Sequence, residues 1–335
     1  MTASAVSGQR VDWRRAVEPY VGPDARRASF QLVTTLGALA AAMVAAHFLL
    51  QWSVWLSLLL VLPIAGLLVR TFIIMHDCAH GSAFGSRAVN DAVGFVTGVL
   101  TLTPFAQWRR DHAMHHASSG DLDRRGHGDV PTLTVREYLA KSPQARRKYR
   151  ILRHPLALLF GGPIHLAVGQ RKRGTSTETG SKQLSSVVAT NLAIALAFAI
   201  VLITVGWQTL LVAWLVPFYF AAMAGVWLFY VQHQFEDAYW ARKGEWDYAD
   251  ASLRGSSHLQ LPPVLAWFTG DIGLHHVHHI APRIPNYRLQ RCHDENALFH
   301  DSPVITIASG MASLRLALWD EDRQRLVRFR DAESS

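Results

Sequence analysis

The chain of 335 residues contains few charged residues and few cysteines. Only 17% of its residues are charged, whereas 50% are hydrophobic, and an ordinary soluble domain carries about 25% charged residues. This shortage indicates a membrane protein. Cys78 and Cys292 form no CxxC pair and no disulfide framework. We interpret Cys78 as a buried side chain and not as a metal ligand.

The chain also lacks the features of a secreted or nucleic-acid-binding protein. Residues 1–28 contain no short apolar core with a cleavage site, so we predict a cytoplasmic N-terminal tail and no signal peptide. The net charge of +8 is explained first by cytoplasmic Lys and Arg. Contact with anionic lipid or an acidic protein is the second interpretation. No nucleic-acid-binding fold accompanies the charge.

Long apolar runs are what the sequence has in abundance. A membrane-spanning helix needs about 20 residues, and four runs meet that length, at about 30–50, 54–74, 184–205 and 210–231. Short turns at 51–53 and 206–208 join them in pairs. Two hairpins would each return the chain to its starting side, with His76 and His80 emerging just past the second span.

The remaining segments are too short or too polar to span. Residues 89–106 and 155–168 are predicted to be interfacial. A re-entrant helix is an alternative interpretation for residues 89–106. Residues 117–183 are rich in Lys and Arg and are predicted to be cytoplasmic. The expected fold is an all-α integral membrane protein with four transmembrane helices in two hairpins, interfacial helices and a cytoplasmic histidine-rich cap. The membrane domain would cover 29–300, with 301–335 as a cytoplasmic C-terminal tail.

Three histidine runs dominate the polar sequence: HDCAH at 76–80, HAMHH at 112–116 and HHVHH at 275–279. Positions i, i+3 and i+4 share one helix face, so each run could aim its imidazoles at one point. Crowded imidazoles resist protonation, whereas a metal ion binds their neutral form. His276 would point about 100° away from His275. His233 stands alone, and its spacing alone does not decide between a ligand and a polar residue.

The other histidines are interpreted as boundary or polar-network residues, with His258 undecided: His47, His127, His154, His165, His293 and His300.

The number of imidazoles indicates the metal. Eight or nine are too many for one ion, whereas two ions would use four or five each. Thiolate ligands are absent, which argues against zinc ribbons and iron–sulfur clusters, and the chain has no Glu-x-x-His pair of the carboxylate di-iron bundles. An all-nitrogen di-iron site with open positions for dioxygen is the best match. Asp77, Asp111 and Asp271 are candidates to orient the imidazoles.

In order and placement, the three runs resemble the histidine boxes of the membrane-bound fatty acid desaturase family. The stretches WLFYVQHQF at 227–235 and GDIGLHHVHH at 270–279 are similar to its bacterial acyl-lipid, omega-6 (Δ12-like) branch. The resemblance covers roughly residues 30–300 and implies a ninth ligand, His233. The implied metal ligands are His76, His80, His112, His115, His116, His233, His275, His278 and His279.

The resemblance also implies an activity. Two iron ions would use dioxygen as co-substrate to introduce a cis double bond into an acyl-lipid or fatty acyl chain, with no catalytic side chain outside the metal ligands. The electron donor would be a separate protein of ferredoxin or cytochrome type. The enzyme would lie among the lipids of a bacterial-type inner membrane, with both termini and the active site cytoplasmic.

Two other functions fit the same residues. A lipid or alkane hydroxylase would use the same histidines but insert oxygen. A membrane metal transporter would place ionisable residues along a path inside the spans, whereas these histidines are expected beyond the span ends. Double-bond position, chain length, acyl carrier and oligomeric state are left open.

Overall fold

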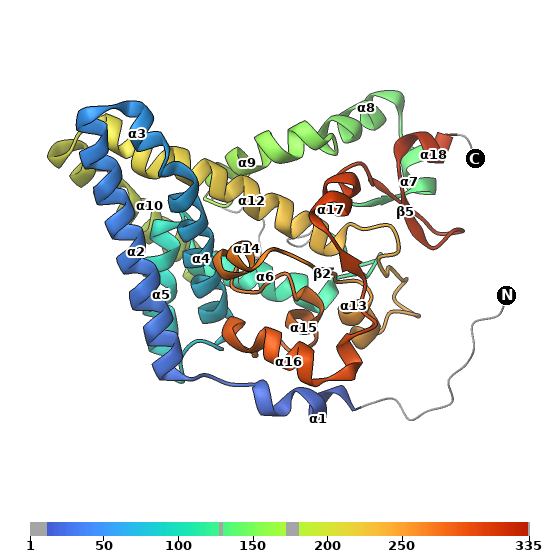
Figure 1. The fold of residues 1–335 in the computed structure, drawn as a ribbon. Coiled ribbons are helices and arrows are strands. Elements are labelled where there is room, and N and C mark those ends of the chain that lie inside the picture. The colour runs from blue at the N-terminus through green and yellow to red at the C-terminus, as the bar shows by residue number, and fades with distance from the viewer. Residues whose placement is uncertain (1–11, 127–129, 172–180, 334–335) are drawn as a thin grey trace.

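Helices make up most of the computed structural model, which describes residues 12–126, 130–171 and 181–333 (Figure 1). The N-terminal half comprises α1 (Trp13–Val17), η1 (Glu18–Tyr20), α2 (Ala25–Trp52), α3 (Val54–Leu58), α4 (Val61–His80), α5 (Arg87–Leu100), α6 (Phe105–Ser118), β1 (Leu133–Thr134), α7 (Val135–Leu139), α8 (Pro143–Leu152), η2 (Ala157–Gly161) and α9 (Gly162–Gly169).

The rest of the chain begins with two long helical segments and continues in short elements. These are α10 (Ser181–Thr204), α11 (Trp207–Leu210), η3 (Leu211–Leu215), α12 (Val216–His233), α13 (Tyr248–Leu253), β2 (His258–Leu259), α14 (Pro263–Phe268), α15 (His275–Ile280), η4 (Asn286–Arg288), α16 (Leu289–Glu295), η5 (Ala297–Phe299), β3 (Val304–Ile305), α17 (Ile307–Ser313), β4 (Leu318–Asp320), β5 (Arg325–Val327) and α18 (Phe329–Glu333).

Four helical segments are long and apolar enough to cross a membrane, and each overlaps one predicted span. They cover Ala25–Trp52, Val54–His80, Gln183–Thr204 and Trp207–His233. Large apolar side chains such as Leu62, Leu192 and Ile203 are exposed on their outer surfaces, as lipid-facing residues would be.

The second of these segments is longer than the sequence predicted. His76 and His80 do not emerge past its end, because α4 continues without a break to His80. No proline or glycine follows Gly66 until Gly81, which ends the helix with a positive φ of 67°. The histidines therefore occupy the last two turns of the helix itself.

Two further helix pairs are bent at a short break. α5 and α6 meet at 101°, and α8 meets the η2–α9 segment at 66°. By length and composition each pair is either a broken span or a re-entrant loop, which raises the possible number of spans from four to six. The bend after α5 directs α6 across the bundle, where its histidines lie beside α4.

Helix α4 lies at the centre of the bundle and packs against α2, α5, α12 and α14. Close approach of α14 requires a glycine on α4. A Cβ atom on Gly66 would lie 2.6 Å from the ring of Phe268, so any larger residue would push α14 away.

Residues 301–333 fold back onto the polar part of the chain. β4 pairs in parallel with β1 and antiparallel with β5, while β3 pairs in parallel with β2. Trp319 and Leu326 are buried. α17 packs on α12, where a Cβ atom on Gly310 would lie 3.1 Å from Trp227.

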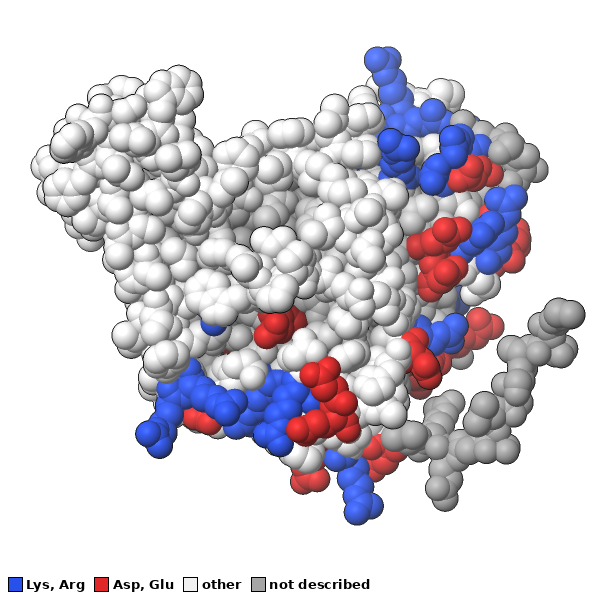
Figure 2. Space-filling model, in the orientation of Figure 1, with Lys and Arg blue, Asp and Glu red and all other residues white. Residues whose placement is uncertain are grey.

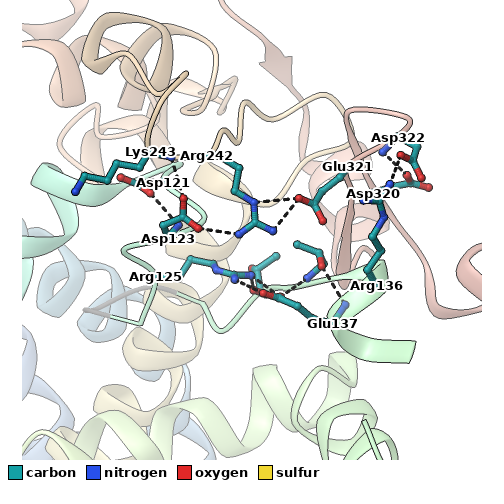
Figure 3. Close-up of polar contacts among 12 residues, drawn as sticks. Asp121, Asp123, Arg125, Arg136, Glu137, Arg242, Lys243, Asp320, Glu321 and Asp322 are labelled. Atoms are coloured by element: carbon teal, nitrogen blue, oxygen red, sulfur yellow. Dashed lines mark hydrogen bonds and ion pairs between the residues drawn. The ribbon is translucent and has the colours of Figure 1, made fainter. Parts of the chain in front are cut away.

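Ion pairs connect this C-terminal segment to α7 and to the loop that carries Arg242 (Figure 3). Arg242 donates to Asp123 at 2.7 Å and to Glu321 at 2.8 Å. Arg136 donates to Asp322 at 2.6 Å. These groups are partly exposed, so each pair contributes about 1 kcal/mol or less.

A buried arginine makes a stronger connection. Arg153, which is 2% exposed, donates to the carbonyl oxygens of Pro131 at 2.8 Å and Leu316 at 3.0 Å. It also donates to the Tyr230 hydroxyl at 3.0 Å and the Gln234 Oε1 at 2.8 Å. One guanidinium group therefore joins the C-terminal segment to the end of α12, where His233 lies between these two partners.

We expect Arg153→Met to destabilise the protein by about 3 kcal/mol or more, because several buried acceptors lose a charged donor. The midpoint of denaturant unfolding of the solubilised protein measures this loss. The matched control is Arg147→Met on α8, the helix that ends just before Arg153; the Arg147 side chain is exposed. Equal midpoints for the two variants would contradict the importance of the Arg153 contacts.

Candidate metal centre

The nine histidines identified from the sequence gather into two adjacent groups. One contains five imidazoles, from His76, His80, His112, His116 and His278, and the other contains four, from His115, His233, His275 and His279. Within each group one ring nitrogen per residue lies within 4.8 Å of all the others. We call them the five-histidine group and the four-histidine group.

Four helices supply these side chains. α4 contributes two to the five-histidine group from its last turns, and α12 contributes its final residue, His233, to the four-histidine group. α6 and α15 each contribute to both groups. The two groups are in direct contact, since the rings of His116 and His279 stack with centroids 4.1 Å apart.

The expectation that each run aims all its imidazoles at one point is wrong for two of the three runs. In α6, His112 and His116 join one group whereas His115 joins the other. In α15, His275 and His279 stay together and His278 separates. Residues i+3 and i+4 differ by about 100° around a helix axis, so a single face is wide enough to serve two sites.

The distances between ring nitrogens fit shared metal ligands. In the five-histidine group, His278 Nε2 lies 3.1 Å from His76 Nε2 and 3.0 Å from His116 Nε2. In the four-histidine group, His233 Nε2 lies 3.1 Å from His115 Nε2 and 2.9 Å from His275 Nε2. Two ligands at about 2.1 Å from an ion and at right angles to each other would be about 3 Å apart.

Hydrogen bonding alone leaves several of these nitrogens unsatisfied. His80 Nε2 and His279 Nε2 are buried without a hydrogen-bond partner among the described residues. A neutral imidazole nitrogen carries either one proton or one lone pair. At most one of the two short contacts of His278 Nε2 is therefore a good hydrogen bond. Metal ions that accept all the lone pairs resolve both problems, and the donor set therefore fits metal binding.

The environment also favours the neutral form of the three α15 imidazoles that belong to these groups. Burial lowers the pKa of His275, His278 and His279 well below the usual value, and neighbouring imidazoles lower each one further. A neutral imidazole presents the lone pair that a metal requires.

One of the three acids named from the sequence contacts an imidazole. Asp77 Oδ1 lies 3.3 Å from His76 Nδ1. Its other oxygen accepts hydrogen bonds of 2.8 Å from both the backbone N–H and the side-chain amide of Asn286. Asn286 in turn bonds to Gln31, so the carboxylate is held from the side opposite the histidine.

The other two acids have different partners among the described residues. Asp111 accepts hydrogen bonds from Gln107 at 2.9 and 3.1 Å. The pKa of Asp271 is raised because burial outweighs the opposing effect of the nearby Arg70. Sequence proximity to a histidine run was therefore a poor guide to contact with it.

Sequence reasoning missed several groups that hold the histidines. The Gly255 carbonyl lies 3.2 Å from His233 Nδ1, and Trp108 stacks on His112 with ring centroids 4.3 Å apart. The Tyr248 hydroxyl donates to the His279 carbonyl at 2.6 Å. The Gly255 and Tyr248 contacts join residues 22 and 31 positions apart and leave no local pattern, whereas Trp108 lies one helical turn before His112 on α6.

The other seven described histidines lie outside both groups. His276 Nε2 lies 3.2 Å from His293 Nδ1, and the His258 and His300 rings also lie beside His293. Burial lowers the pKa of His276 to about 3. His47 bonds to Thr209 at 2.8 Å, while His154 and His165 belong to neither group. His127 lies outside the described residues.

Comparison with known proteins identifies the family. The family model described as "Fatty acid desaturase" matches residues 50–306, which is most of the chain. The chain belongs to the fatty acid desaturase family.

Curated relatives agree with this assignment. A fatty acid desaturase of Bacillus subtilis is 38% identical over 330 residues, covering 98% of this chain and 94% of the relative. An sn-1 oleoyl-lipid 12-desaturase of Synechocystis is 27% identical over 68% of this chain and 64% of the relative. A chloroplastic omega-6 fatty acid desaturase of Arabidopsis thaliana is 28% identical over 67% of this chain and 49% of the relative. This desaturase-family chain is therefore an oxidoreductase.

We expect His278→Ala to reduce bound metal and to abolish product formation, because its Nε2 lies between two other nitrogens of the five-histidine group. Metal quantification of the purified protein and product analysis measure the two effects. His300→Ala is the control, since that ring is exposed and lies outside both groups. If His278→Ala retained full metal content and activity, His278 would be removed from the ligand set.

Proposed function

We propose that this desaturase uses two iron ions and dioxygen to introduce a cis double bond into the acyl chain of a membrane lipid, with omega-6 (Δ12-like) selectivity. The observation that supports it most is the pair of buried all-histidine groups at the ends of apolar helices. The names of the cyanobacterial and chloroplast relatives support the selectivity.

The side chains of the protein would bind the metal ions, orient their ligands and exclude bulk water. The nine imidazoles would hold the ions, five nitrogens on one and four on the other, leaving open positions for exogenous ligands. Bound iron would supply the oxidising power that an unactivated C–H bond requires. Asp77 fixes the orientation of His76, and the buried position of the two groups keeps bulk water away from the reaction.

The overall reaction balances with an external source of electrons. Two adjacent methylenes lose two hydrogen atoms, and dioxygen is reduced to two molecules of water. The substrate provides half of the reducing equivalents, so two electrons and two protons come from elsewhere. We propose a separate ferredoxin-type or cytochrome-type protein as the electron donor.

Fatty-acid analysis of a host that expresses this chain tests the activity. We expect a new acyl species lacking two hydrogens, formed only in air, and its absence in cells that express His112→Ala. Gain of one oxygen atom in place of the loss of two hydrogens would show a hydroxylase. Metal transport into vesicles without oxygen consumption would point to a transporter.

We also propose that both termini and the histidine groups face the cytoplasm of a bacterial-type inner membrane. The excess of Lys and Arg in residues 1–28 and 117–183 supports this orientation. Reporter domains fused to the C-terminus measure it, since we expect only a reporter active in the cytoplasm to function. Activity of a periplasmic reporter at that end would contradict the orientation.

A further inference from the structure

Arginine side chains gather where α2 begins. Figure 2 shows Lys and Arg at the lower edge of the molecule, below a broad uncharged surface, and Figure 1 places the start of α2 and α16 there. Backbone contacts join these elements, since the Gly22 N–H donates to the Arg283 carbonyl at 3.1 Å. We call the following five residues the basic face: Arg26, Arg27, Arg283, Arg288 and Arg291.

The basic face carries a real excess of charge. Arg26 and Arg283 are exposed and pair with no carboxylate among the described residues. Arg27 and Arg288 share Asp24, each at 3.8 Å. Arg291 pairs with Glu295 at 2.8 Å. Five guanidinium groups therefore share two carboxylates in ion pairs, and the exposed Asp294 on α16 adds one further acid. The remaining excess of positive charge attracts an acidic partner.

This face also lies close to the five-histidine group. Asn286, between Arg283 and Arg288 in the chain, is buried and bonds to Asp77, which contacts His76. Only two buried side chains thus connect the loop that carries the arginines to an imidazole of the group. The ion pairs around Arg242 are largely balanced by acids. The cations of α8 have no acid on their own helix, but α8 lies at the opposite edge of the molecule from the start of α2 and α16 (Figure 1).

We propose that the basic face is the docking surface for a small acidic one-electron carrier protein. This inference rests on the proposed function, because a desaturase needs two electrons per turnover from outside. Two successive docking events would each deliver one electron through the thin layer formed by Asn286 and Asp77. Charge attraction steers such encounters and makes them sensitive to salt.

The test uses the full-length enzyme in lipid nanodiscs with an acidic plant-type ferredoxin as the donor. We expect the double substitution Arg26→Glu, Arg283→Glu to raise the KM for ferredoxin about tenfold or more and to flatten its salt dependence, while kcat and iron content stay close to wild type. Glutamate near the start of a helix is favourable, and Arg283 has no buried partner to lose, so the variant should fold.

The control makes the same charge change elsewhere. Arg147→Glu, Lys148→Glu reverses two exposed cations on α8 and should leave the KM for ferredoxin unchanged. An equal rise in KM for both double variants, or no rise in the Arg26, Arg283 variant, would overturn the docking surface. So would a defect that depends on the anionic lipid content of the nanodisc and not on ferredoxin, because it would assign these arginines to lipid headgroups.

A chemical reductant distinguishes failure of the docking surface from failure of the proposed desaturase function. Wild-type enzyme reduced by dithionite and a small mediator would then form no unsaturated product at all. Product formation with dithionite, together with a wild-type KM for ferredoxin in the Arg26, Arg283 variant, would reject the docking surface alone.

Discussion

The structure depends on the crowding of nine imidazoles in two adjacent, largely buried groups. Ring nitrogens about 3 Å apart repel one another when they present lone pairs, and burial denies them relief by protonation or hydration. Bound metal ions would turn this unfavourable arrangement into a favourable one. Because the nine imidazoles come from α4, α6, α12 and α15, these four helices must all meet at the two histidine groups.

The surrounding fold holds those helices in position. α4 is the shared packing partner of α2, α5, α12 and α14. The end of α12 is fixed through Arg153, whose guanidinium also binds the C-terminal segment at Leu316. Small strands and partly exposed ion pairs add further links between these segments. The result is a rigid frame on one side of the apolar bundle, and a rigid frame is what a site with directional ligands requires.

Much of this architecture could be predicted from the sequence. Apolar runs of sufficient length predicted the four long apolar helices. Histidine spacing predicted eight of the nine group members, and only the family resemblance added His233. Periodicity could not assign the members to their groups, because positions i, i+3 and i+4 cover an arc wide enough for two ions. Contacts between distant residues, such as Asp77 with Asn286, left no local signal. Strands of two or three residues, such as β4 and β5, were too short for a period to be recognised.

The sharing of α6 and α15 between the two groups has a mechanical consequence. His278 lies on one side of the α15 axis, and His275 and His279 lie toward the other. Rotating α15 to bring His278 closer to the five-histidine group would move His275 and His279 within the four-histidine group. A short helix shared in this way couples the positions of the two groups, so a displacement of α15 would change the ligand geometry that both groups offer to metal ions.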